Sequence, residues 1–126
     1  MANEDTSQPT DDAGAAPRPE DVEIVIVTMV FDAKPDDMAA AERLLGVLSN
    51  YVVVSRQEPG CRNIDFCNSV TTPSRLVLIE KWESEEAQRA HFDGRHMVEM
   101  AQACEGLLAE KPVVDLLEGI SAHDLV

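Results

Sequence analysis

The sequence has few aromatic residues and none of the features typical of a membrane or secreted protein. Aromatic side chains make up only 4% of its 126 residues. No apolar run approaches the roughly 20 residues that cross a bilayer. The first residues lack the basic start and apolar segment of a secretory signal. We therefore expect a cytoplasmic protein without a membrane partner.

Cysteine is scarce as well, and its placement argues against disulfides and metal. The three cysteines are Cys61, Cys67 and Cys104. The first two fall on one expected strand, where a bridge between them would break the strand. No Cys-x-x-Cys or His-x-x-x-His spacing suggests a metal site. Free thiols and no bound metal are expected.

Basic residues are greatly outnumbered by acidic ones. Ten lysines and arginines stand against 24 acids, and the net charge is −14. Such a charge opposes phosphate backbones and anionic lipid at long range, which argues against nucleic-acid partners and membrane surfaces. Residues 1–21 hold six acids, three prolines and hardly any apolar bulk. Such a segment cannot offset its ordering entropy, so we expect a disordered arm at 1–21, one domain at 22–120 and a tail at 121–126.

The apolar residues present, 44% of the chain, suffice for the core of one domain. Residues Glu23–Phe31 are β-branched or apolar at nearly every position, which predicts a strand that needs cover on both faces. Pro35 and Asp36-Asp37 then suggest the first turn of a helix that continues to about Arg56. Its expected apolar face is Met38, Ala41, Leu45, Leu48 and Val52.

Two further strands are expected at Arg62–Asn68 and Leu76–Trp82. The first segment alternates between polar and apolar residues, the second begins with an apolar run, and a Thr-Thr-Pro-Ser loop joins them. They should pair as an antiparallel hairpin.

Ser84 is a good N-cap for the next helix, and Gly94 should divide that helix into two pieces, with Asp93 capping the second. The expected inward face is Ala87, Ala90, His91, Gly94, Val98, Ala101, Cys104 and Leu108. Lys111-Pro112 should end the helical region, and Val113–Leu117 should form the last strand.

The resulting order, βαββαβ, predicts an α+β, ferredoxin-like fold with one antiparallel sheet and its helices on one side. Helices can cover only one face of that sheet, yet the first strand is apolar on both. The second face should therefore pack against the same face of another copy, giving a homodimer with a barrel-like interface.

Two segments carry a resemblance to a known family. Glu80-Lys81-Trp82 ends a strand and leads into the helices that carry His91 and His96, and upstream lies the turn Glu58-Pro59-Gly60-Cys61. Together they resemble the antibiotic biosynthesis monooxygenase family of dimeric α+β barrels, over about Val22 to Gly119. The resemblance implies the fold and a range of activities: cofactor-independent quinol and polyketide oxygenases, haem degraders, and an isomerase acting on a quorum-signal breakdown product.

Alternation along the strand puts Glu80 and Trp82 on one face. The resemblance implies that Trp82 lines a pocket, while the alternative is simple packing at the end of the sheet. Glu80 would either orient a substrate hydroxyl or a histidine, or serve in an ion pair or cap. His91 should face inward, and its imidazole is suited to take a phenolic proton; the alternative is a core histidine with its bonds satisfied.

Five more residues are candidates for a substrate pocket: Phe66, Tyr51, Phe92, His96 and Met97. Each has an alternative in ordinary packing, and His96 one as a cap or rim residue. The haem degraders have an asparagine on the first strand, and their helix histidine falls at the position of Phe92 here. The first strand of this chain has no asparagine. The resemblance therefore argues against haem, and we expect no cofactor.

These observations favour a cofactor-independent monooxygenase that oxidises a small quinol or phenolic metabolite, with His91 as base. Two alternatives stay open. One is an isomerase or tautomerase of a small hydroxy-ketone, which needs the same histidine and no oxygen. The other is a non-catalytic, dimeric ligand-binding or stress-associated protein.

Overall fold

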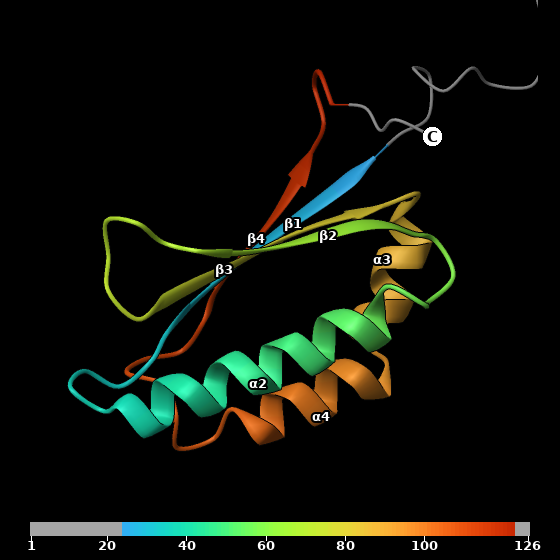
Figure 1. Cartoon of the computed structure of the whole chain (residues 1–126). Coiled ribbons are helices and arrows are strands. Elements are labelled where there is room, and N and C mark those ends of the chain that lie inside the picture. Colours follow the sequence, from blue (N-terminus) through green and yellow to red (C-terminus); the bar gives the residue numbers. More distant parts are fainter. Residues whose placement is uncertain (1–23, 123–126) are drawn as a thin grey trace, which may run out of the picture.

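The computed structural model describes residues 24–122 as four strands and three helices (Figure 1). In chain order these are β1 (Val25–Asp32), α2 (Met38–Ser55), β2 (Cys61–Asn68), β3 (Arg75–Trp82), α3 (Glu85–Phe92), α4 (Arg95–Ala103) and β4 (Val113–Glu118). The expected arm at 1–21 lies outside the described residues, and so does most of the tail expected at 121–126.

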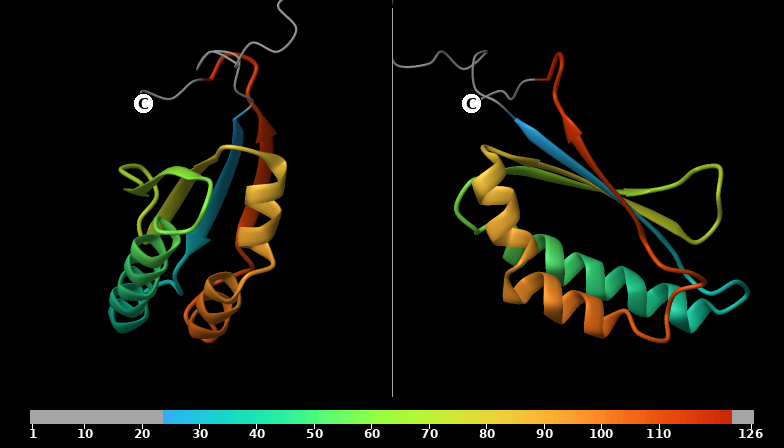
Figure 2. Two further views of the ribbon diagram at one scale, coloured as in Figure 1. Left: turned by 90° about the vertical axis from the view of Figure 1, so that its right-hand side faces the viewer. Right: turned by 180° about the vertical axis from the view of Figure 1, so that it is seen from behind.

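The strands form one antiparallel sheet in the order β2-β3-β1-β4. All three helices lie on one side of it, and α2 and α4 run side by side in opposite directions (Figure 2). The α+β, ferredoxin-like fold expected from the order of the elements is confirmed.

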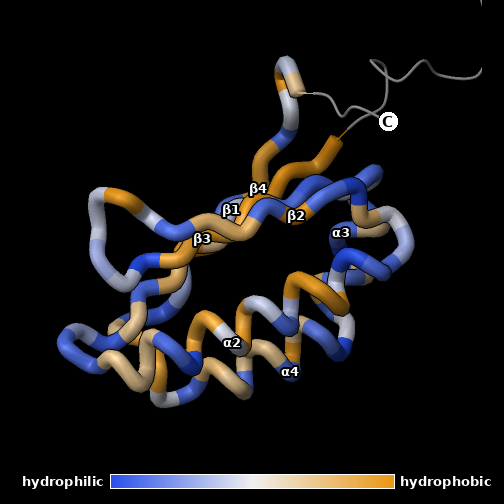
Figure 3. Tube along the Cα trace, viewed as in Figure 1, coloured by the Kyte–Doolittle hydropathy of each residue, from blue (hydrophilic) through white to orange (hydrophobic). Residues whose placement is uncertain are grey.

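Burial alternates strictly along the two central strands. On β1 the buried positions are Val25, Val27, Met29 and Phe31, and on β3 they are Leu76, Leu78, Glu80 and Trp82. These side chains face the helices, so the core lies between the sheet and α2 and α4. Apolar residues also follow β1 and β4 over much of their length (Figure 3), and the opposite face of the sheet carries half-buried Ile26, Val30 and Ile79.

The start and the buried face of α2 differ from expectation. Asp36 has φ +57, which no helix allows, and the N-cap is Asp37, whose Oδ1 accepts from the Ala40 amide at 2.9 Å. Pro35 therefore precedes the helix. The buried positions are Ala40, Leu44, Leu48, Tyr51, Val52 and Ser55, whereas Met38 and Leu45 are exposed. The true face is rotated from the expected one because the sheet, and not the most apolar stripe, decides which side is covered.

The break at Gly94 is confirmed, but the cap and the end of the second piece are not. Asp93 is the C-cap of α3, and Gly94 itself is the N-cap of α4, without a side-chain bond. The helix ends at Ala103, well before Lys111, because Gly106 has φ +81 and the chain turns there. On α4 the expected residues Val98 and Ala101 are exposed, whereas Met100 is buried, and Cys104 after the helix is buried as expected.

Candidate functional site

Glu80 and Trp82 point together from β3 towards the helices. Both are almost completely buried, and the Trp82 indole N–H donates to Glu80 Oε1 at 3.0 Å. A carboxylate in the core is costly unless hydrogen bonds replace its lost water. The structure therefore places at Glu80 a polar centre that its neighbours must satisfy.

His91 comes to the same centre from α3. Ser84 caps that helix by accepting from the Ala87 amide at 3.1 Å, and the Glu83 amide donates to the Gly60 carbonyl at 2.9 Å, which ties the helix start to the turn before β2. The imidazole is 1% exposed and stacks on Trp82, with ring centroids 4.5 Å apart.

Tyr51 of α2 links the carboxylate to the imidazole. Its hydroxyl oxygen lies 2.6 Å from Glu80 Oε2 and 2.7 Å from His91 Nε2. Burial, followed by the charge of Glu80, raises the pKa of the Tyr51 phenol far above its ordinary value of 10. The phenol is therefore a permanent hydrogen-bond donor in this centre.

Glu58, in the turn between α2 and β2, is a member of the site that the sequence analysis missed. Its Oε1 lies 3.0 Å from His91 Nδ1, and its Oε2 lies 2.6 Å from His96 Nδ1. The Glu58-Pro59-Gly60 turn was visible in the sequence, but nothing in its spacing indicated two histidines as partners. We call Glu80, Tyr51, His91 and Glu58 the buried network.

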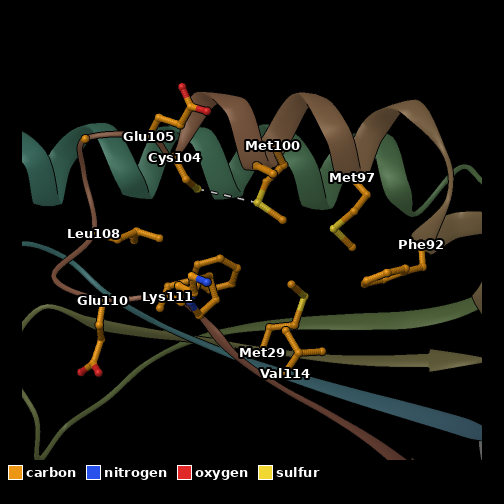
Figure 4. Close-up of a pocket in the computed structure, with 14 residues that line it drawn as sticks. Met29, Phe92, Met97, Met100, Cys104, Glu105, Leu108, Glu110, Lys111 and Val114 are labelled. Carbon is orange, nitrogen blue, oxygen red and sulfur yellow. Dashed lines mark hydrogen bonds between the residues drawn. The ribbon is translucent and has the colours of Figure 1, made fainter.

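An apolar cavity of about 470 Å³ lies between α4, the segment after it and the sheet, and its lining includes Phe92, the residue after His91. Figure 4 shows Met97 and Met100 of α4 facing Met29 and Val114 of the sheet, with Phe92 at one end. Much of the wall is thioether and aromatic, a surface that suits a flat apolar ligand. Glu105, Glu110 and Lys111 are its charged lining residues.

The residues that the sequence predicted for one site are distributed over two hollows, the buried network and the core. Phe92 and Met97 line the cavity, directly after His91 and His96 in the chain. Tyr51 and His96 line a second hollow of about 370 Å³ between α2 and α4, which shares Met100 with the cavity. Glu80, Trp82 and His91 line neither of these hollows. Phe66 packs against the core from β2.

Two absences hold for residues 24–122. They contain no group of three histidine, cysteine, aspartate or glutamate side chains placed to hold a metal ion. Within the same range, no helix is both long enough and apolar enough to cross a bilayer.

The fold and the buried site define an α+β protein of the ferredoxin-like class with a pocket between sheet and helices. The sequence model of the family described as "Antibiotic biosynthesis monooxygenase" matches residues 24–103. The chain belongs to this family.

Individual proteins are similar to this chain in fold or in sequence. The structure of Rv0793 from Mycobacterium tuberculosis is 27% identical, with a TM-score of 0.71 over 79% of this chain and 97% of that one. PA3566 from Pseudomonas aeruginosa, 24% identical, shares the fold with a TM-score of 0.67 over 80% of this chain and 97% of that one. An uncharacterized Synechocystis protein, sll1783, is 26% identical over 86 residues, which are 68% of this chain. The match spans 56% of that relative's length.

Proposed function

We propose that this protein is a cofactor-independent monooxygenase that oxidises a small quinol or phenol bound in the apolar cavity. The observation that carries the proposal is a cavity lined by methionine and phenylalanine whose lining residue Phe92 directly follows His91, a buried histidine held between two glutamates. Family membership supports the reaction class. The substrate class is inferred from the apolar wall and the nearby proton acceptor.

The reaction requires little from the protein beyond proton removal and a dry pocket. A phenolic or enolic hydroxyl gives its proton to His91, and the electron-rich anion passes an electron to dioxygen, which avoids the spin barrier. Overall the substrate gives up two hydrogens and gains one oxygen atom, and the other oxygen atom leaves as water. The substrate supplies all the electrons, so the reaction needs no external reductant.

His91 can meet a substrate only if one of its partners gives way. Both ring nitrogens are engaged in this structure, Nε2 with Tyr51 and Nδ1 with Glu58. We propose that the substrate hydroxyl replaces that of Tyr51. The present occupant supports this exchange, because Tyr51 is itself a phenol held between Glu80 and His91.

We further propose that the working form is a homodimer joined through the sheet face opposite the helices. That face carries Ile26, Val30, Val77 and Ile79, and its apolar middle is only partly covered within one chain. A second copy of the same face would supply the missing cover. A cytoplasmic location stays a prediction from the sequence.

The first test is turnover of a panel of quinols and phenols by the full chain, followed with an oxygen electrode and no added metal, flavin or haem. We expect dioxygen uptake that His91→Gln lowers on the order of a hundredfold, as for removal of a positioned base. Glutamine suits this test better than alanine, since its amide fills the space beside Trp82 and still bonds Tyr51 or Glu58. Ala101→Trp should obstruct the cavity and raise KM, whereas Gln102→Trp, its exposed neighbour that does not line the cavity, should not.

One observation favours a second candidate, a non-catalytic ligand-binding protein. His91 is 1% exposed and fully bonded, as a structural histidine would be. Calorimetric binding of phenols, blocked by Ala101→Trp but without turnover, would support this candidate over the first. Turnover of a hydroxy-ketone without oxygen uptake would instead support an isomerase.

A further inference from the structure

The buried network contains more short polar contacts than its ordinary hydrogens can fill. Three contacts link its four members in series: Glu80 to Tyr51 at 2.6 Å, Tyr51 to His91 at 2.7 Å, and His91 to Glu58 at 3.0 Å. Each contact needs one hydrogen between its two heavy atoms to be attractive. Three hydrogens are therefore required.

The usual protonation states supply only two. Tyr51 has one hydrogen, and its raised pKa means that it keeps it. A neutral imidazole has one N–H, and two ionised carboxylates have none. One of the three contacts would then set lone pair against lone pair. No water can intervene at the two contacts of Tyr51, because Tyr51, Glu80 and His91 are each 1% exposed. At the third contact Glu58 is 19% exposed, but its Oε1 still lies 3.0 Å from His91 Nδ1.

One additional proton removes the conflict, and it can be on the imidazole, on Glu80, or on Glu58, which would then donate to Nδ1 of a ring that is protonated at Nε2. If it is on the imidazole, His91 donates to Tyr51 and Glu58, and Tyr51 donates to Glu80. If it is on Glu80, that carboxyl donates to Tyr51, Tyr51 donates to His91, and His91 donates to Glu58. Moving one hydrogen along each of two contacts converts the first pattern into the second, so Tyr51 can pass a proton in either direction.

We propose that the buried network holds this additional proton at neutral pH and acts as a proton relay whose outer end is Glu58 and His96. These two side chains are 19% and 23% exposed and bonded to each other, so the chain of contacts runs from the core to solvent. The proton reduces the magnitude of the network's net charge from −2 to −1, which is favourable because buried charge is costly.

Other titratable groups around the network do not replace this proton. Cys61 on β2 is a neutral thiol, because burial, followed by the charge of Glu80, raises its pKa to about 11. Arg56, at the end of α2, donates to the Ile64 carbonyl at 2.7 Å. His96 of α4 bonds Glu58 Oε2, the oxygen that His91 does not use.

The relay gives the proposed reaction a route for its proton. The additional proton would first leave to solvent through Glu58 and His96, which frees His91 Nε2 to take the proton of a hydroxyl that has replaced that of Tyr51. This role rests on the proposed function, whereas the proton count does not. Tyr51 and Glu58 are in this view positioning residues of the relay.

The number of protons in the buried network is tested by ¹⁵N NMR of the histidine rings in the full chain at about pH 7, together with infrared spectra of carboxylic acid groups. We expect either an imidazolium at His91, with both ring nitrogens protonated, or a singly protonated ring together with a carboxylic acid band that Glu80→Gln or Glu58→Gln removes. A singly protonated His91 without such a band would overturn the proposal.

Two isosteric variants sharpen the test because their amides supply the missing hydrogen from opposite ends. In Glu58→Gln the amide can donate to Nδ1, so the ring should keep a hydrogen only on Nε2. In Glu80→Gln the amide can donate to Tyr51, so the ring should keep a hydrogen only on Nδ1. Glu86→Gln, an exposed change in the first turn of α3, should leave the ring as in the unchanged protein.

The same tautomer in both variants would contradict the relay. An additional proton without turnover of any phenol would overturn the proposed function alone. Turnover without the additional proton would overturn the relay alone.

Discussion

At the scale of single residues, the protein is organised around a carboxylate that ordinary core packing would not tolerate. Glu80 lies at a β3 position flanked across the sheet by Val27 and Ile64. Its two oxygens are occupied by the Trp82 indole and the Tyr51 hydroxyl. Each of these partners has an apolar body and a polar tip, so each can be buried and still satisfy the charge. The one tyrosine and the one tryptophan of the sequence are thus used as hydrogen-bond donors.

Tyr51→Phe tests this arrangement, because it removes the hydroxyl and keeps the shape of the ring. It leaves Glu80 Oε2 and His91 Nε2 without their shared partner inside the core, and we expect a loss of about 1 to 3 kcal/mol in the free energy of unfolding. Ser55→Ala is the matched control, since it also removes a buried hydroxyl from α2, but one with no hydrogen-bond partner among the described residues. That change should be neutral or slightly stabilising. Equal losses in urea titrations of the two variants would contradict the role of Tyr51.

At the scale of elements, the turn between α2 and β2 decides whether the site can assemble. It carries Glu58, and its Gly60 carbonyl accepts from the Glu83 amide just before α3. Gly60 has φ +84, and a Cβ there would collide with the Cβ of Ala87 on α3. The close approach of turn and helix is what brings Glu58 within reach of both histidines.

Gly60→Ala should therefore be costly in two ways, through backbone strain and through displacement of α3. We expect a loss of about 1 to 3 kcal/mol from the strained backbone, with the collision adding to it. Gly46→Ala in α2 is the comparison, because nothing lies within 4 Å of its added Cβ. There we expect a gain of about 0.5 to 1 kcal/mol from helix propensity. Thermal denaturation of both variants measures the difference, and a stable Gly60→Ala protein would show that the turn can relax.

At the scale of the whole molecule, the sheet has one covered face and one that residues 24–122 leave open. The helices cover one face, and β4 at the edge is exposed along its entire length. Ile79 lies in the middle of the open face, between Thr28 of β1 and Asp65 of β2. An apolar centre in such a place is the pattern expected of a surface that meets a partner.

Ile79→Asp should separate the proposed dimer without unfolding the chain. The side chain is only partly buried in one protomer, so a charge there can reach water once the partner leaves. We expect sedimentation to give twice the 13.8 kDa chain mass for the unchanged protein and the single mass for the variant. Val70→Asp, in a fully exposed loop position, should remain a dimer. A well-folded monomer of the unchanged protein would refute the dimer proposal.

The sequence by itself determined the elements, their order and the family, because these depend on local patterns. Alternation along Leu76–Trp82 correctly placed Glu80 and Trp82 on one face, and the break at Gly94 was visible as a glycine in a helical stretch. Strand period, helix caps and turn residues act over a few positions, so they can be recognised without knowing what lies opposite.

Only the tertiary structure decided how α2 is rotated, where the cavity lies and which side chains meet. The buried face of α2 runs through Ala40 and Leu44, since the sheet selects it from two competing apolar stripes. Tyr51 and Glu80 are 29 positions apart, and Glu58 and His91 are 33 apart. Contacts over such separations leave no periodic trace in the chain. They arise because the βαββαβ fold brings the end of α2, the end of β3 and the end of α3 to one corner of the core.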